Sequence, residues 1–235
     1  MCKRKTYRSL IPIYILVISG FITAGFCSNM AITALSEQKP ANYSHTIVID
    51  AGHGGMDGGA TSCSGVLESK INLEIALKLN DLMHLLGIHT AMIRSADTSI
   101  HTNGNTIAQQ KVSDLKERVR IVNDVDGAIL VSIHQNHFTD ARYSGAQVFY
   151  GPAEDSKELA QQLQQSIIKE LNPGSNRQIK KAEGIYLMQN TNCTGVLIEC
   201  GFLSNPTEEK MLRDDAYQQK LCCVIASVLS CYLAA

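Results

Sequence analysis

The stretch IVIDAGHGG, residues 47–55, joins an apolar run to a turn of small residues with His53 at its centre. A short apolar run that ends in a turn is typical of a strand buried on both faces, as in a parallel sheet. Glycine-rich turns after such strands often bind phosphate groups. The histidine at the centre of this turn favours a different chemistry.

The turn matches neither of two common phosphate-binding motifs. Counting from Gly52, the dinucleotide pattern Gly-x-Gly-x-x-Gly finds Asp57 at its third glycine position, and no Gly-Lys-Ser/Thr follows for a P-loop. A nucleotide site is therefore not indicated. Taken alone, His53 could equally be a structural histidine in a tight turn.

The rest of the chain alternates between strand-like and helix-like apolar spacing. With 235 residues, a single domain is expected, and no boundary follows residue 42. The alternation indicates an α/β fold, with a mainly parallel twisted sheet flanked by helices. The polar residues 95–112 are expected to form a long loop, with Ser113 as N-cap of the next helix. The expected strands are 45–51, 88–93, 127–134, 145–150 and 195–200, and the expected helices are 71–86, 113–125, 156–171 and 207–233.

The N-terminal residues resemble a targeting signal. Four basic residues precede an apolar segment of residues 10–27, and no further charged residue occurs until Glu37. Because a basic flank stays on the cytoplasmic side, the folded domain is expected outside the cytoplasmic membrane, either secreted or tethered through residues 10–27. The expected divisions are 1–36 as signal peptide or membrane anchor, 37–44 as linker and 45–235 as the folded domain.

Charge and cysteine content narrow the class of protein. The formal charge is 21 − 22 = −1, and residues 43–235 alone carry 16 − 21 = −5. No nucleic-acid partner is expected, because that affinity depends on Lys and Arg neutralising phosphates and no basic stripe occurs. Eight cysteines in an exported chain would ordinarily indicate disulfides, but two lie in the leader and two are adjacent in an apolar stretch. Free thiols are therefore favoured.

Three ionisable residues, His53, His134 and Glu199, follow apolar strands. The ligand crevice of an α/β sheet lies outside the carboxyl ends of its strands, so these residues are expected to converge at one edge. Two histidines and a carboxylate are the ligand set of a catalytic zinc, and a second carboxylate, here Glu199, would move protons. The chain has neither HExxH nor Gly-x-Ser-x-Gly, so a helix-borne protease site and an α/β-hydrolase nucleophile are not indicated. Spacing leaves the ligand carboxylate open among Asp50, Asp57, Glu68 and Glu74.

Five motifs occur in the order found in one family of bacterial cell-wall hydrolases. They are IVIDAGHGGMDGGA, GVLESKINLEIALKL, LKERVRIVN, LVSIHQN and VLIECGFLSNP, and they cover about residues 45–233. In these motifs the chain resembles the zinc-dependent N-acetylmuramoyl-L-alanine amidases of the amidase type 3 family. The resemblance implies a zinc-aminopeptidase-like α/β fold, one bound Zn²⁺ and peptidoglycan as substrate. It also implies hydrolysis of the amide between N-acetylmuramic acid and L-alanine.

The resemblance further implies roles for individual residues. Glu199 matches the catalytic glutamate. Arg118 and Asn136 lie in matching motifs as candidate supporting residues, and for Arg118 structural pairing is an equal alternative. The chain departs from the family at Ala51, where proline is usual, and at Cys200, where valine is usual. The expected zinc ligands are His53, Glu68 and His134.

A closer resemblance, to the germination-specific spore-cortex amidases of spore-forming bacteria, rests on GIYLMQN at 184–190, SGAQVFYG at 144–151 and the polar segment 95–112. It implies removal of stem peptides from cortex muramic acid, muramic δ-lactam formation and germination competence. The location would be the spore intermembrane space or cortex. Two alternatives stay open: another zinc hydrolase of the stem peptide, and a catalytically inactive wall-binding protein. The sequence does not define an accessory protein or show whether the leader is cleaved.

Overall fold

A computed structural model describes residues 45–234, so the expected leader and nearly all of the linker lie outside the described residues. Strands and helices largely alternate along this part of the chain. The strands are β1 (Thr46–Ala51), β2 (Thr90–Met92), β3 (Ala128–Asn136), β4 (Gln147–Tyr150), β5 (Lys180–Lys181) and β6 (Thr194–Phe202). The helices are α2 (Glu68–Leu85), α3 (Ile107–Asn123), α4 (Ser156–Glu170), α5 (Tyr186–Asn190), α6 (Pro206–Leu212) and α7 (Asp215–Leu233).

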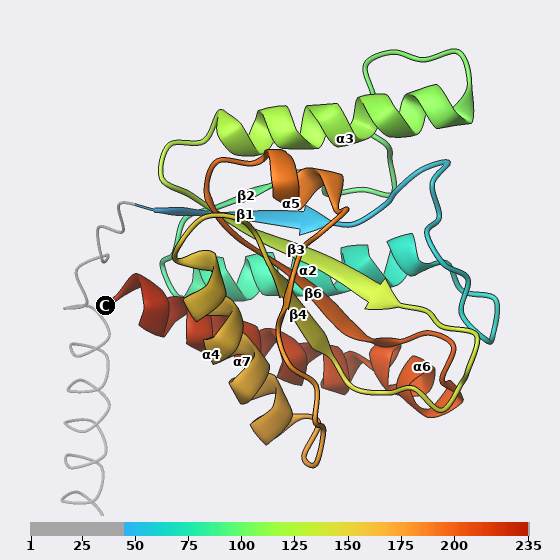
Figure 1. The fold of residues 1–235 in the computed structure, drawn as a ribbon, viewed down its shortest axis with the longest axis vertical. Helices are drawn as coiled ribbons and strands as arrows, with labels where there is room; N and C mark the ends of the chain where they lie inside the picture. The colour runs from blue at the N-terminus through green and yellow to red at the C-terminus, as the bar shows by residue number, and fades with distance from the viewer. Residues whose placement is uncertain (1–44, 235) are drawn as a thin grey trace, which may run out of the picture. The chain divides into compact units, whose positions relative to one another are not determined.

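These strands form one sheet in the order β2-β1-β3-β6-β4-β5. β1 pairs in parallel with β2 and β3, and β3 pairs in parallel with β6, whereas β4 is antiparallel to β6. Helices α2, α4 and α7 cover one face of the sheet, and α3 and α5 cover the other (Figure 1). The expected α/β fold with a mainly parallel sheet is confirmed.

The apolar run of β1 is buried between the two helical layers. Ile47 and Ile49 pack in the core beneath α2 and α7, and Val48 packs on the α3 side. This follows from the alternation of side chains along a strand. All three side chains are fully buried, and burial of such a side chain contributes about 1.5–3 kcal/mol. The run thus fixes the strand that leads into the His53 turn.

Helix α3 begins earlier than the sequence predicted, so the loop before it is shorter than the expected range 95–112. The helix begins at Ile107, and the side chain of Thr106 accepts a hydrogen bond from the amide of Gln109 as its N-cap. Ser113 is not the cap but lies within the helix, where its hydroxyl accepts hydrogen bonds from backbone N–H groups of the preceding loop. The polar composition of the segment hid this helical start.

The helix expected over 207–233 is divided into α6 and α7. Asp214 lies between them, and its side chain accepts a hydrogen bond from the amide of Tyr217, which caps α7. The short elements β5 and α5 were not predicted, because two and five residues are too few to establish a period. Neither α7 nor any other helix in residues 45–234 is long and apolar enough to cross a membrane.

The carboxyl ends of β1, β3 and β6 lie side by side at one edge of the sheet. β3 and β6 extend past their expected ends at residues 134 and 200, so His134 and Glu199 lie inside these strands and not at their last residues. The two residues are paired in register, and a bulge follows between His134 and Asn136. His53 comes two residues after β1. The topology therefore brings all three to this edge.

Candidate metal centre and active site

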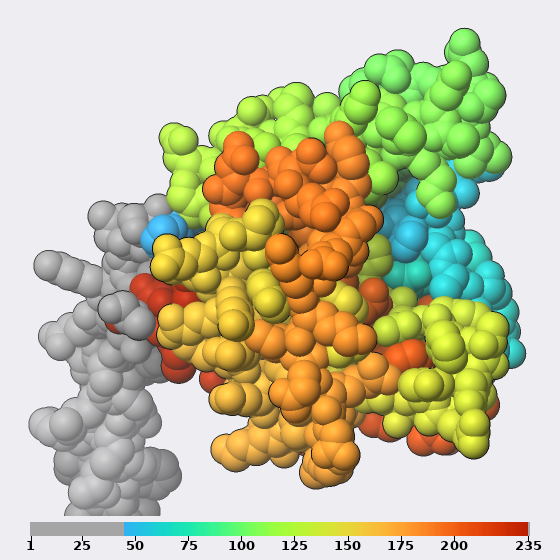
Figure 2. Space-filling view, in the orientation of Figure 1, coloured from blue at the N-terminus to red at the C-terminus, as the bar shows by residue number. Residues whose placement is uncertain are grey.

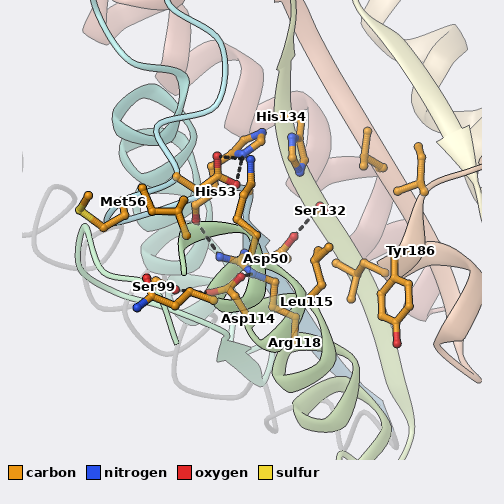
Figure 3. A pocket seen from close by; sticks show the side chains of 18 of the residues that line it. Asp50, His53, Met56, Ser99, Asp114, Leu115, Arg118, Ser132, His134 and Tyr186 are labelled. Atoms are coloured by element: carbon orange, nitrogen blue, oxygen red, sulfur yellow. Dashed lines mark hydrogen bonds and ion pairs between the residues drawn. The ribbon is translucent and has the colours of Figure 1, made fainter. Parts of the chain in front are cut away.

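His53, Glu68 and His134 meet at this edge from three different elements. They come from the turn after β1, the first turn of α2 and strand β3, and one ligand atom of each lies within 4.8 Å of the others. The Nε2 atom of His53 is 3.3 Å from Oε2 of Glu68, and Nδ1 of His134 is 3.0 Å from Oε1 of the same glutamate. Figure 3 shows the two imidazole rings close together at one end of a pocket.

Two glycines make the space that these side chains occupy. A Cβ added at Gly52 would lie 2.2 Å from Nε2 of His134. A Cβ at Gly59 would lie 2.6 Å from Oε2 of Glu68 and 2.7 Å from Cδ2 of His53. Non-bonded carbon contacts settle at about 3.5 Å or more, so neither position can carry a side chain without displacing a neighbour. The small residues of the turn are therefore required by the histidines and carboxylate packed against them.

The backbone and ring of His53 are both held by hydrogen bonds. His53 has a φ of 61°, in the left-handed region that non-glycine residues rarely adopt. Nη2 of Arg118 donates to its carbonyl oxygen at 2.7 Å, which helps to hold this conformation. On the ring, Nδ1 is 2.9 Å from Oδ2 of Asp57, and the other oxygen of Asp57 is 2.8 Å from Nζ of Lys111. A carboxylate on Nδ1 directs the other ring nitrogen, Nε2, toward a ligand.

Glu68 is held just as firmly, with its side chain almost entirely buried. Its Oε1 accepts hydrogen bonds from Nδ2 of Asn72 and from the backbone N–H of Gln135, each at 3.1 Å. Its Oε2 accepts one from the amide of Ala60 at 2.9 Å. These donors fix the plane of the carboxylate between the two imidazoles.

The charges of this cluster favour a cation among the three side chains. Burial alone would raise the pKa of Glu68, but its hydrogen bonds with His134 and His53 outweigh burial and hold the pKa well below its usual range. Burial alone would lower the pKa of His53, but its hydrogen bonds with Glu68 and Asp57 raise the pKa to about 9. A proton or a metal ion can supply the positive charge. Two imidazole nitrogens and one carboxylate are the donor set of a catalytic zinc with an open fourth position, so these residues fit Zn²⁺.

Glu199 lies beside this cluster with one carboxylate oxygen free. Its Oε2 is buried and has no hydrogen-bond partner among the described residues. Burial raises the pKa of Glu199 to about 7. A buried polar atom without a partner is costly and calls for a functional explanation. The adjacent Cys200 packs in the core on the opposite face with Cys222, as strand alternation requires, and so does not point to the cluster.

The two candidate supporting residues differ in what they contact. Arg118 is buried and forms ion pairs with Asp50 and Asp114, while also donating to the His53 carbonyl. These contacts hold the turn that carries His53, and Arg118 also lines the pocket beside the cluster. The backbone carbonyl of Asn136 accepts a hydrogen bond from the loop after β6, at 2.8 Å.

Several residues that build the site were missed in the sequence. Asn72 holds Glu68 and also donates to the carbonyl of Gly52 at 3.1 Å. Its position four residues after Glu68 on one helix face was a readable signal. Arg94, soon after β2, donates to the carbonyls of Ala51 at 2.8 Å and Gly52 at 3.0 Å. The contact between Asp57 and His53 depends on the unusual φ of His53, which no spacing rule predicts.

A pocket of about 300 Å³ adjoins the cluster on the α3 and α5 side of the sheet. His134 and Glu199 are among the residues that line it, together with residues from both helices. Figure 2 shows the surface hollowed between the orange α5 segment, the green α3 segment and the blue turn that carries His53. The cluster is thus open to a ligand that approaches over this face.

The chain belongs to the N-acetylmuramoyl-L-alanine amidase family of amidase type 3, whose family model matches residues 47–230. The family and the enzyme class expected from the sequence motifs are confirmed. The chain is therefore an N-acetylmuramoyl-L-alanine amidase of peptidoglycan.

Individual relatives agree with this assignment. The chain is 37% identical over 177 residues to the germination-specific N-acetylmuramoyl-L-alanine amidase of Bacillus subtilis. This alignment covers 74% of each of the two chains. The chain is similar in structure to the CwlD amidase of Clostridioides difficile, which was solved in complex with the GerS lipoprotein. The two structures match with a TM-score of 0.77 and 39% sequence identity, and the match covers 81% of this chain and 98% of the CwlD chain. A second Clostridium difficile N-acetylmuramoyl-L-alanine amidase has a TM-score of 0.72 at 30% identity, over 83% of this chain and 99% of that one.

Proposed function

We propose that this amidase depends on zinc held by His53, Glu68 and His134, and that Glu199 is its catalytic residue. The observation that carries the proposal is the meeting of three ligand atoms within 4.8 Å of one another, beside a carboxylate oxygen with no partner. A protein that only bound the wall would have no use for this arrangement. A catalytically inactive wall-binding protein is therefore the weaker alternative.

The residues of the chain divide the chemistry between them. When bound, zinc would polarise the lactyl carbonyl of muramic acid and lower the pKa of a water molecule. Glu199 accepts the proton of the attacking water through Oε2 and passes it to the nitrogen of L-alanine as the amide bond breaks. Asp57 keeps Nδ1 of His53 occupied so that Nε2 faces the metal position. Asn72 and Gln135 keep the Glu68 carboxylate from turning away.

We further propose that the enzyme acts on spore-cortex peptidoglycan and that its product leads to muramic δ-lactam and germination competence. The similarity to the germination-specific amidase of Bacillus subtilis supports this role. The enzyme would work outside the cytoplasmic membrane, with residues 1–36 as signal or anchor, 37–44 as linker and 45–235 as the catalytic domain. Loss of the gene should leave cortex without δ-lactam, as measured by muropeptide analysis of spores.

An accessory lipoprotein is proposed as a partner, because the related CwlD amidase was solved with one. The full chain and a lipoprotein from the same organism should elute together after co-expression. Separate elution, with activity unchanged by the lipoprotein, would argue against such a partner.

The decisive experiment for the reaction is digestion of purified peptidoglycan by the full chain, with and without a chelator. Mass spectrometry should find new muramic acid carboxyl groups and new N-terminal L-alanine, and the chelator should abolish both. New ends elsewhere in the stem peptide would instead identify another kind of stem-peptide hydrolase. Full activity in the presence of the chelator would contradict the proposal that the enzyme requires zinc.

A further inference from the structure

Two aromatic side chains are exposed together on the loop between β3 and β4, residues 137–146. Phe138 and Tyr143 are each 48% exposed. Their ring centroids lie 4.7 Å apart and their planes meet at 72°, so the rings are in edge-to-face contact and form one surface. Single apolar residues are common on protein surfaces, but large rings that gather at one place indicate a binding surface.

Hydrogen bonds from the segment after β6 hold the backbone that carries both rings. The backbone N–H of Phe138 donates to Oγ of Ser204 at 3.1 Å. Nδ2 of Asn205 donates to the carbonyl oxygens of Ala141 at 2.9 Å and Tyr143 at 3.3 Å. A loop that is already fixed loses less conformational entropy when a ligand binds, so this loop is prepared for binding.

Further side chains restrain the segment around Tyr143. The buried ring of Phe202 lies 6.2 Å from the ring of Tyr143, centroid to centroid. The guanidinium of Arg177 lies 4.5 Å from the centroid of Phe202, and Nε of Arg177 donates to the carbonyl of Ser144 at 2.7 Å. The tyrosine ring therefore has a fixed place on the surface while half of it faces solvent.

The charged side chains of the loop neutralise each other. Nη2 of Arg142 lies 2.7 Å from Oδ2 of Asp140, and Nε of Arg142 also donates to this carboxylate. No other Asp, Glu, Lys or Arg occurs in 137–146. Because charges on a binding surface complement those of its ligand, this surface suits a neutral ligand better than an anionic lipid or a charged protein segment.

The loop leads directly away from the candidate metal centre. Phe138 follows His134 by four residues, and four extended residues span at most about 14 Å. In Figure 2 this yellow-green segment lies on the same face as the hollow beside the cluster, on the side of the hollow away from α3. A ligand several sugar rings long that reaches the cluster can therefore also cover the two aromatic rings.

Peptidoglycan provides a ligand of this shape. The muramoyl group of the substrate belongs to a glycan chain, and the pocket of about 300 Å³ beside the cluster is too small for a length of glycan. The glycan must therefore extend over the neighbouring surface. A pyranose ring has a face of C–H groups that packs against an aromatic ring, while its hydroxyls stay in water, and N-acetylglucosamine has no charge. An exposed, uncharged aromatic surface matches this chemistry.

We propose that Phe138 and Tyr143 form a glycan subsite, which stacks on the N-acetylglucosamine next to the muramoyl group that reacts. This inference rests on the proposed function, because that function places the reacting carbonyl at the cluster. The subsite makes the enzyme select muramoyl groups within a glycan chain over isolated ones.

The test compares two substrates that carry the same dipeptide, using the zinc-loaded full chain. One is N-acetylmuramoyl-L-alanyl-D-isoglutamine, and the other is a tetrasaccharide of alternating N-acetylglucosamine and N-acetylmuramic acid with L-alanyl-D-isoglutamine on the muramic acids. The variants are Phe138→Ala, Tyr143→Ala and Tyr143→Phe. Leu85→Ala is the matched control, because Leu85 is 82% exposed at the opposite end of α2 from Glu68. The melting temperature of each variant checks folding.

The ratio of kcat/KM for the tetrasaccharide to that for the monosaccharide decides the outcome. The wild type should prefer the tetrasaccharide by about tenfold or more, and Leu85→Ala should keep this ratio. The ratio should fall by about threefold to tenfold in Phe138→Ala and in Tyr143→Ala, mainly through KM, as expected for loss of one stacking ring. Tyr143→Phe keeps the ring and should keep the ratio.

A binding measurement separates the subsite from the chemistry. The Kd of the peptide-free tetrasaccharide, measured by calorimetry on the chelator-treated full chain, should rise by a similar factor in the two alanine variants and stay unchanged in Leu85→Ala. If the wild type cleaves neither substrate, the proposed function fails, and this Kd alone decides whether the rings bind glycan.

Three results would overturn the inference and leave the proposed function standing. The first is an unchanged substrate ratio in both alanine variants. The second is an equal fall in the ratio in the Leu85→Ala control. The third is loss of self-association or of lipoprotein binding in the alanine variants with the ratio and the glycan Kd unchanged, which would identify the surface as a protein interface.

Discussion

Replacing Gly52 with alanine tests how closely the turn is fitted to the candidate metal centre. The backbone of Gly52 lies outside the left-handed region, so the substitution adds a steric conflict without backbone strain. The new Cβ would lie 2.2 Å from Nε2 and 2.3 Å from Cε1 of His134. Since such contacts settle at about 3.5 Å, the ring must retreat by 3.5 − 2.2, or about 1.3 Å.

A retreat of this size should be measurable in three ways. Misplacement of a catalytic group by about 1 Å costs about 10²-fold in rate, so kcat/KM on a muramyl peptide should fall by about that factor. Zinc affinity, measured by competition with a chromophoric chelator, should also fall, because Nδ1 of His134 moves with the ring. Overpacking should lower the free energy of unfolding in urea by about 1–3 kcal/mol.

Gly151→Ala is the matched control for this prediction. A Cβ at Gly151 meets its nearest atom at 3.4 Å, an ordinary contact, and Gly151 also lies outside the left-handed region. This variant should keep wild-type zinc affinity and turnover. A Gly52→Ala variant with the zinc affinity and kcat/KM of the control would refute the argument that the glycine makes room for the ligand.

Three further changes probe the surroundings of the site. Asp57→Ala should weaken zinc binding by about 10–100-fold in the chelator competition, because His53 loses the carboxylate on Nδ1; unchanged affinity would show that the contact is incidental. Arg118→Met leaves Asp50 buried without its cation and should lower the unfolding free energy by about 3–5 kcal/mol. Burial alone would raise the pKa of Asp50, but Arg118 outweighs burial and holds the pKa of Asp50 below its ordinary value of 3.8. This stabilisation is therefore present above that value and is lost as the pH falls below it. Urea titrations from pH 6 to pH 3 should therefore show a steeper loss in the wild type than in Asp50→Asn, and parallel losses would contradict this. Thr106→Ala should cost about 1 kcal/mol through loss of the α3 N-cap, and no change in unfolding free energy would argue against capping.

The order of the longer strands and helices, and the edge of the sheet that carries the site, could be predicted from the sequence. The apolar runs before His53, His134 and Glu199 are strong signals, and parallel strands place their carboxyl ends together. The bounds of these strands were less predictable. β3 continues through the polar residues Gln135 and Asn136, and β6 continues to Phe202, because neighbouring strands supply hydrogen bonds there. The polar segment before Ser113 likewise contains the first turns of α3, which its composition does not reveal.

The inner structure of the site was harder to predict, because it depends on three-dimensional contacts between distant segments. Arg94 and Arg118 hold carbonyls of the same turn although they lie on different elements. A glycine such as Gly59 is expected in a turn from its residue type alone. That a side chain at this position would collide with Glu68 is visible only in the folded structure. Motif resemblance supplied Glu68 as the expected ligand, where spacing alone left four carboxylates open.

The central claim is that water attacks the muramoyl carbonyl at this site with Glu199 moving the proton. The most direct test is digestion of purified peptidoglycan in ¹⁸O-labelled water by wild type and by Glu199→Gln, each carrying the same measured amount of zinc. The wild type should place one ¹⁸O atom in the lactyl carboxylate of muramic acid and free the amino group of L-alanine, and the variant should do so about 10²–10⁴-fold more slowly. Label in any other product, or equal rates from the two proteins, would contradict the account.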